Sequence, residues 1–110
     1  GCVVDGLPFC YDSGTFSYRV NAGDKAEFVL RRQVDEVEVF FAQGAAGIGG
    51  RMTFFDANGL QVGAPIQTNG ICADLMPATQ TVTFDTPVVR IRVRAIDTDV
   101  YVDSLALRRL

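Results

Sequence analysis

Apolar and polar residues alternate with a period of two along most of the chain, which is typical of β-strands that bury one face. The clearest strand is residues 87–96. Its inner face is predicted to carry Val89, Ile91, Val93 and Ala95, and its outer face Arg90, Arg92 and Arg94. One strand therefore gathers three cations on a single side of the sheet.

The same alternation predicts further strands at residues 15–20, 34–41, 51–55, 60–67, 79–84 and 100–107. In the second of these, Val37, Val39 and Phe41 are expected to face inward, and Glu36, Glu38 and Phe40 outward. Residues 56–59, Asp-Ala-Asn-Gly, favour positive φ and predict a hairpin between their flanking strands. Residues 85–87 and 97–99 are predicted to be turns.

Residues 25–32 fit two interpretations. Asp24 and Glu27 have the spacing of a helix-capping pair. As a strand, the segment would place Ala26, Phe28 and Leu30 inward. Because the neighbouring segments are all strands, we favour the strand. About eight short strands separated by turns predict one antiparallel β-sandwich or barrel spanning residues 1–110.

The composition narrows the classes of function. The chain has 110 residues, 48% of them hydrophobic and 21% charged, with a net charge of −3, which argues against a nucleic-acid-binding protein. It contains no histidine, the commonest general base, so we expect no enzyme activity. It also contains no apolar run of about 18–20 residues, so we expect no membrane insertion.

Three cysteines bear on the cellular compartment. Cys2 and Cys10 flank a turn-like stretch, and a disulfide between them would staple an N-terminal arm, residues 1–14. Alternatively the cysteines are unpaired thiols, or Cys72 pairs with either of them. The chain looks like an excised domain, and the cysteines favour an exported one.

The arginine row allows two interpretations. Arg90, Arg92 and Arg94 could bind an acidic polysaccharide, because guanidinium pairs with carboxylate or sulfate in a fixed fork. Alternatively they form cross-strand ion pairs with Asp35, Glu36 or Glu38. Aromatic rings offer sugars a second kind of contact. Without tryptophan, the candidate rings are Tyr11, Tyr18 and Tyr101, with outward Phe40 or Phe55.

Three aspartates near the end of the chain form a candidate metal site. Calcium takes carboxylate oxygens without histidine, so Asp97, Asp99 and Asp103 are its candidate ligands. Aspartates in turns also commonly bond their own backbone. Asp103 lies inside the last strand, where a calcium ion, an arginine or a β-bulge would each explain it.

The second half of the chain carries a recurring order of segments. M-T-F-F-D, A-N-G and L-Q-V-G are followed by a polar loop, P-V-V-R-I-R-V-R-A and D-V-Y-V-D-S-L-A-L. Over residues 34–107 this order is similar to the galactose-binding-domain-like jelly rolls of secreted bacterial proteins. The resemblance implies an eight-stranded jelly-roll sandwich, a carbohydrate ligand and, with Asp103 at the family's aspartate, a structural calcium ion near the terminal strands.

These observations together predict a non-catalytic module that binds a carbohydrate, with acidic glycans among the candidate ligands. We expect it to lie outside the cell or on its surface, within a larger multidomain protein. The alternative is a structural or adhesive accessory domain that binds no small ligand.

Overall fold

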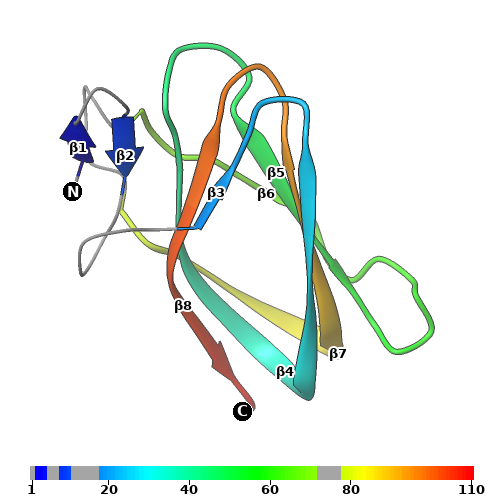
Figure 1. Cartoon of the computed structure of the whole chain (residues 1–110). Coiled ribbons are helices and arrows are strands. Elements are labelled where there is room, and N and C mark those ends of the chain that lie inside the picture. Colours follow the sequence, from blue (N-terminus) through cyan, green and yellow to red (C-terminus); the bar gives the residue numbers. More distant parts are fainter. Residues whose placement is uncertain (1, 5–7, 11–17, 72–77) are drawn as a thin grey trace.

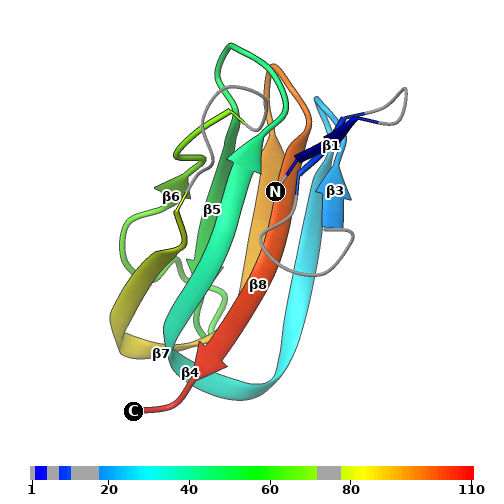
Figure 2. The same ribbon diagram turned by 90° about the vertical axis from the view of Figure 1, so that its left-hand side faces the viewer.

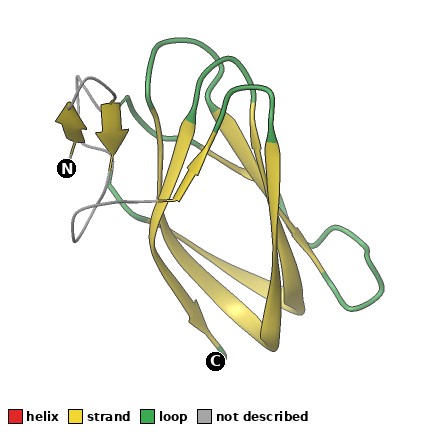
Figure 3. Cartoon of the chain, in the orientation of Figure 1, coloured by secondary structure: helices red, strands yellow, loops and turns green. Residues whose placement is uncertain are grey.

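The computed structural model describes residues 2–4, 8–10, 18–71 and 78–110, and the side chains of the last two ranges. Strands make up 66% of the described residues, which contain no helix (Figure 3). The strands are β1 (Cys2–Val4), β2 (Pro8–Cys10), β3 (Tyr18–Val20), β4 (Lys25–Gln43), β5 (Gly50–Phe55), β6 (Ile66–Gln67), β7 (Gln80–Ala95) and β8 (Val100–Arg108). No described helix is long and apolar enough to cross a membrane.

Six strands form one antiparallel sheet in the order β3-β8-β4-β7-β5-β6, and β1 pairs with β2 in a separate hairpin. The large sheet curls into a half-barrel, which Figures 1 and 2 show from two sides. The predicted all-β, antiparallel class is confirmed. An eight-stranded jelly-roll sandwich is not confirmed, because the core is enclosed by one curled sheet.

The two longest strands, β4 and β7, each run through a position where the sequence predicted a break. The predicted turn at residues 85–87 is wrong, because these residues lie inside β7. The register between the two strands shifts on either side of Val34, which pairs with Val88. Such irregularities bend a strand, and a bend also tolerates Pro87, which has no N–H to donate. In Figure 1 both strands turn the same corner of the sheet.

The inner face of the curl holds the core. Its fully buried side chains include Val37, Val39, Phe41, Met52, Phe54, Val88, Ile91, Val93 and Val100. The predicted inward faces of residues 34–41 and 91–95 are thus confirmed. Val89 is an exception: it is only half-buried, and Val88 takes the core position because the register shift changes the alternation.

The end of β4 is covered on both faces. Phe40 was expected to face solvent, but it is 0% exposed and forms a second cluster with Ala42 and Tyr101. Phe41, next to it, lies in the inner core. That expectation was wrong because it assumed that each strand has one solvent face, which holds only where nothing covers the second face.

Two further local predictions are confirmed, and a third holds in part. Residues 25–32 form the first part of β4, and Ala26, Phe28 and Leu30 pack against the core. The strand predicted at residues 60–67 is reduced to an isolated bridge between Gln61 and Phe55 and to Ile66–Gln67, although β5 pairs in the expected hairpin with β6. At the turn before it, the Asp56 carboxylate accepts hydrogen bonds from two backbone N–H groups, and Gly59 adopts a φ of 81°.

Candidate anion-binding face

Five cations gather on the outer face of the sheet, opposite the core, where β4, β7 and β5 lie side by side. We call this set the basic face: Lys25, Arg51, Arg90, Arg92 and Arg94. It holds half of the ten basic residues of a protein whose net charge is −3. The period-two alternation puts these residues on one side, and the strand register then brings them together.

The register arranges the basic face in cross-strand rows. In one row Arg94 lies between Lys25 on β4 and Arg51 on β5. In the next row Arg92 lies opposite Glu27 and Thr53, and in the third Arg90 lies opposite Val29 and Phe55. Neighbouring strands are about 4.8 Å apart, so the members of a row are close neighbours.

Glu27 neutralises part of this charge. Arg92 donates a hydrogen bond from Nε to Oε1 of Glu27 at 2.9 Å, and Nη1 of Arg90 lies 3.8 Å from Oε2. The hydrogen bond from Arg92, followed by the charges of Arg90, Arg92 and Lys25, lowers the pKa of Glu27 below its ordinary value. Glu27 therefore stays ionised at neutral pH and holds two of the five cations.

Phe55 holds the same two cations from the other side. The guanidinium carbon of Arg90 lies 4.6 Å from the centre of the Phe55 ring, and that of Arg92 lies 4.9 Å from it. A cation over an aromatic face is attracted by the ring's negative charge density. The two arginines also bury Phe55, although its side chain points outward. The Phe55 ring is therefore not available to stack on a sugar.

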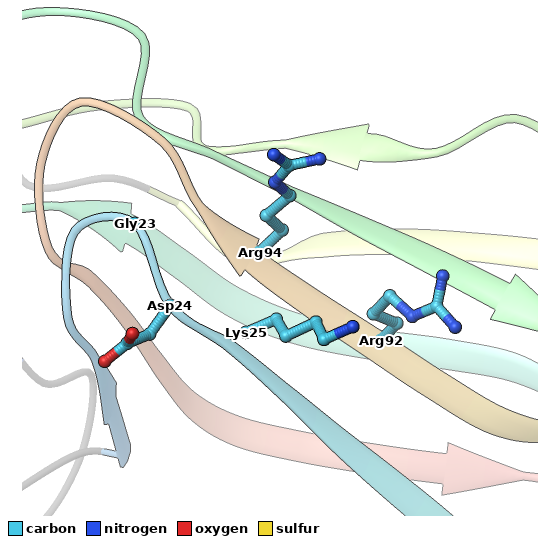
Figure 4. A pocket seen from close by; sticks show the side chains of 5 residues that line it. All are labelled: Gly23, Asp24, Lys25, Arg92 and Arg94. Carbon is cyan, nitrogen blue, oxygen red and sulfur yellow. The ribbon is translucent and has the colours of Figure 1, made fainter.

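The other three cations remain open. Among the described residues, no carboxylate lies within ion-pair distance of Lys25, Arg51 or Arg94. Two open hollows adjoin Arg92 and Arg94. One, of about 590 Å³, also includes Lys25 and the turn before it, and the other, of about 330 Å³, includes Arg51 and Thr53. Figure 4 shows the first hollow, with the Asp24 carboxylate pointing away from the arginines.

The expected ion-pair partners of the arginine row were wrong. Glu36 and Glu38 both bind Arg108 on β8, at 2.6 Å and 2.7 Å. Asp35 accepts a hydrogen bond from the backbone N–H of Leu110. These acids lie beyond the bend of β4, where Glu36 and Glu38 pair with β8 and with Thr83 and Thr81 of β7, so they lie several residues along β7 from its arginines.

The two described tyrosines, which lie on β3 and β8, do not join the arginines. Tyr18 is exposed on β3 and packs edge-on against Phe28, whose ring faces the core side of β4. Tyr101 is 1% exposed, because its ring is covered in the cluster with Phe40, so this structure leaves it no surface for a ligand. Tyr11 lies outside the described residues.

The three aspartates of the predicted metal site bind separate parts of the protein. Asp97 accepts the N–H of Ile48, and Asp99 accepts the N–H of Ala22. Asp103 pairs with Phe40 beside a register shift, where Ser104 has a φ of 49°, which fits the bulge among the three explanations. No group of three potential metal ligands is found among the described residues. Calcium stays a prediction.

Cys2 and Cys10 are direct partners in the antiparallel pair of β1 and β2. Such partners have Cα atoms about 4.5–5.5 Å apart, which suits a disulfide. The structure does not show the bond, and the side chains of this hairpin are outside the described residues. Cys72 is outside them too.

Sequence reasoning found the arginines of β7 but missed the residues that complete the face. Lys25 and Glu27 were placed correctly on the outward side of their strand, and Arg51 at the start of the hairpin. Nothing in the local pattern says that both strands flank β7. Comparison with protein-family models, curated proteins and solved structures gives no match.

Proposed function

We propose that this domain is a non-catalytic module that binds an acidic polysaccharide on its basic face. The observation that carries the proposal is the concentration of charge: five cations and one carboxylate share one sheet surface of an acidic protein. Like charges side by side destabilise a sheet, so a binding partner that neutralises them gives such an arrangement a purpose.

The shape of the face favours a polymer over a small molecule. The two hollows are open and lie next to each other on the surface of the sheet, with Arg92 and Arg94 adjoining both. Small ligands are usually enclosed in concave pockets, whereas an extended chain can lie across an open face. Guanidinium groups supply forked hydrogen bonds to carboxylate or sulfate groups along such a chain.

We propose further that the domain works outside the cell or on its surface, as part of a larger protein. The pairing of Cys2 with Cys10 supports this, because a disulfide there would need an oxidising compartment. If this disulfide forms, thiol counting in denaturant should find no free thiol in a Cys72→Ser variant. Two free thiols would contradict it. A jelly-roll relationship to galactose-binding-like domains stays part of this proposal.

The proposal is tested with dextran sulfate and with dextran, which have the same sugar backbone and differ in charge. We expect the protein to bind dextran sulfate at low salt, to release it at high salt, and to ignore dextran, because exposed ion pairs are screened by salt. Polygalacturonate tests whether carboxylate groups serve as well as sulfate.

A matched pair of variants locates the binding surface. Arg51→Gln with Arg94→Gln removes two charges from the basic face, and Arg32→Gln with Arg109→Gln removes two charges elsewhere. We expect the first variant to lose most of its affinity and the second to keep it. Absence of binding by the unmodified protein, or equal loss in both variants, would contradict the proposal and favour a structural or adhesive accessory domain.

A further inference from the structure

The five cations of the basic face are not equivalent, and the difference gives the face a direction. Arg90 and Arg92 both contact the Glu27 carboxylate and the Phe55 ring. Lys25, Arg94 and Arg51 form a cross-strand row in which no described carboxylate takes part. Two perpendicular paths therefore exist for a bound chain: along β7 over its three arginines, or across the strands over this row.

The row across the strands is the better anion site. An anion bound at Arg90 or Arg92 must approach the Glu27 carboxylate, whose oxygen atoms lie 3.8 Å and 2.9 Å from those guanidinium groups. The bound anion and the Glu27 carboxylate would both be negative and lie close together. They therefore repel each other, most strongly where water is partly excluded. An anion bound at Arg94 meets cations on both neighbouring strands.

The two hollows follow the same line. The larger one joins Lys25 on β4 to Arg94 on β7, and the smaller one joins Arg94 to Arg51 on β5. Arg94 and Arg92 line both hollows, whereas Lys25 and Arg51, at the ends of the row, line one each. Since adjacent strands are about 4.8 Å apart, the row suits anionic groups repeated at about 5–10 Å along an extended chain.

We infer that Glu27 sets the path of the bound chain: by occupying Arg90 and Arg92, it leaves Lys25, Arg94 and Arg51 as the anion-binding row, so that the chain crosses β4, β7 and β5 instead of following β7. The inference rests on the proposed function and adds the direction of the ligand and a residue that selects it. Glu27 is a positioning residue, since it acts through the two arginines.

Single substitutions distinguish the two paths, with dextran sulfate oligosaccharides as the probe and isothermal titration calorimetry as the measurement. Arg51→Gln and Arg94→Gln should each weaken binding about three- to tenfold, as expected for a lost charge-assisted hydrogen bond. Arg90→Gln should change affinity less than about twofold. A path along β7 predicts the reverse for Arg51 and Arg90.

Glu27→Gln should strengthen binding, unlike the arginine substitutions. It therefore distinguishes a specific role of Glu27 from a general loss of affinity. It should tighten binding about threefold or more, because Arg90 and Arg92 become available to the ligand. Asp85→Asn, which makes the same change in net charge at an exposed site elsewhere on β7, serves as the control and should have a smaller effect. Circular dichroism checks that each variant is folded.

The outcomes separate this inference from the proposed function. If the unmodified protein does not bind dextran sulfate, the proposed function fails and the path falls with it. If the protein binds but Arg90→Gln weakens binding as much as Arg94→Gln, the path is along β7 and the inference is overturned. Glu27→Gln with no gain beyond that of Asp85→Asn overturns the role of Glu27.

Discussion

The two halves of β4 show how one strand with one alternating pattern serves two purposes. Residues 25–29 pair with β7 alone among the described strands, and residues 36–43 pair with β8 and β7. The first half is exposed or half-buried throughout, whereas the second ends in five consecutive buried residues. The bend at Val34 separates the two environments.

Each half contains a cluster of arginine and glutamate side chains, with arginine in excess in the first and glutamate in excess in the second. In the first half, one carboxylate, Glu27, serves two arginines amid further unpaired cations. In the second half, two carboxylates share Arg108. The first cluster leaves positive charge at the surface and the second closes β4 onto β8. The comparison teaches that the neighbouring strand decides whether an outward charge serves binding or structure.

The largest contrast between the halves should be in packing. Phe41→Ala removes a fully buried ring and should lower the free energy of unfolding by about 3–5 kcal/mol. Phe28→Ala removes a half-buried ring at the edge and should cost about 1–2 kcal/mol, within the usual range for single substitutions. Urea denaturation measures both. Equal losses would show that the halves do not differ in packing.

The next effect concerns the closure of β4 onto β8. Arg108→Gln leaves Glu36 and Glu38 near each other without their shared cation, which should lower the urea midpoint measurably. Arg109→Gln is the matched control, since the guanidinium of Arg109 donates to the neutral side chain of Gln33. We expect the control to stay close to the unmodified protein. Equal shifts would exclude a special role for Arg108.

A smaller effect should appear in acid. Because Arg92 and Arg90 lower the pKa of Glu27 from 4.5, the folded state favours the ionised form. Its contribution to stability is therefore complete above about pH 4.5 and is lost as the pH falls through the lowered pKa. The stability gap between the unmodified protein and Glu27→Gln should narrow over that range. A gap that is constant from pH 7 to pH 3 would contradict the pairing.

The smallest effect should come from Val29, which is 79% exposed on the first half of β4. Val29→Thr keeps a β-branched side chain and should change the free energy of unfolding by less than about 0.5 kcal/mol. It should also leave dextran sulfate binding unchanged, since Val29 lies outside the anion-binding row. A large loss of stability would mean that this face is covered in solution.

The sequence predicted the strands well and their boundaries poorly. Alternation placed Val37, Val39 and Phe41 correctly in the core, and Asp56 with Gly59 correctly in a turn, because both signals depend on residues that are close in the chain. The turn expected around Pro87 was wrong. Its residues are typical of turns, but pairing with β4 across the bend keeps them extended.

In the candidate site, too, the local arrangement was predicted correctly and the contacts between distant segments were not. Arg90, Arg92 and Arg94 share a face as their spacing predicts, but the identity of their counter-ion was wrong. Glu27, Glu36 and Glu38 look alike in the sequence, since all three are outward acids on alternating segments of β4. Only the bend and the register distinguish the acid that binds the arginines of β7 from the two that bind Arg108 of β8.

The sequence alone determines that this protein is all-β, which side of most strands is apolar, and that three arginines of β7 share one side. These properties follow from the two-residue period of a single strand. The tertiary structure decides that Lys25 and Arg51 flank Arg94, that Glu27 holds Arg90 and Arg92, and that Tyr101 is buried. The physical reason is that strand order and register depend on contacts between distant segments, which no local pattern specifies.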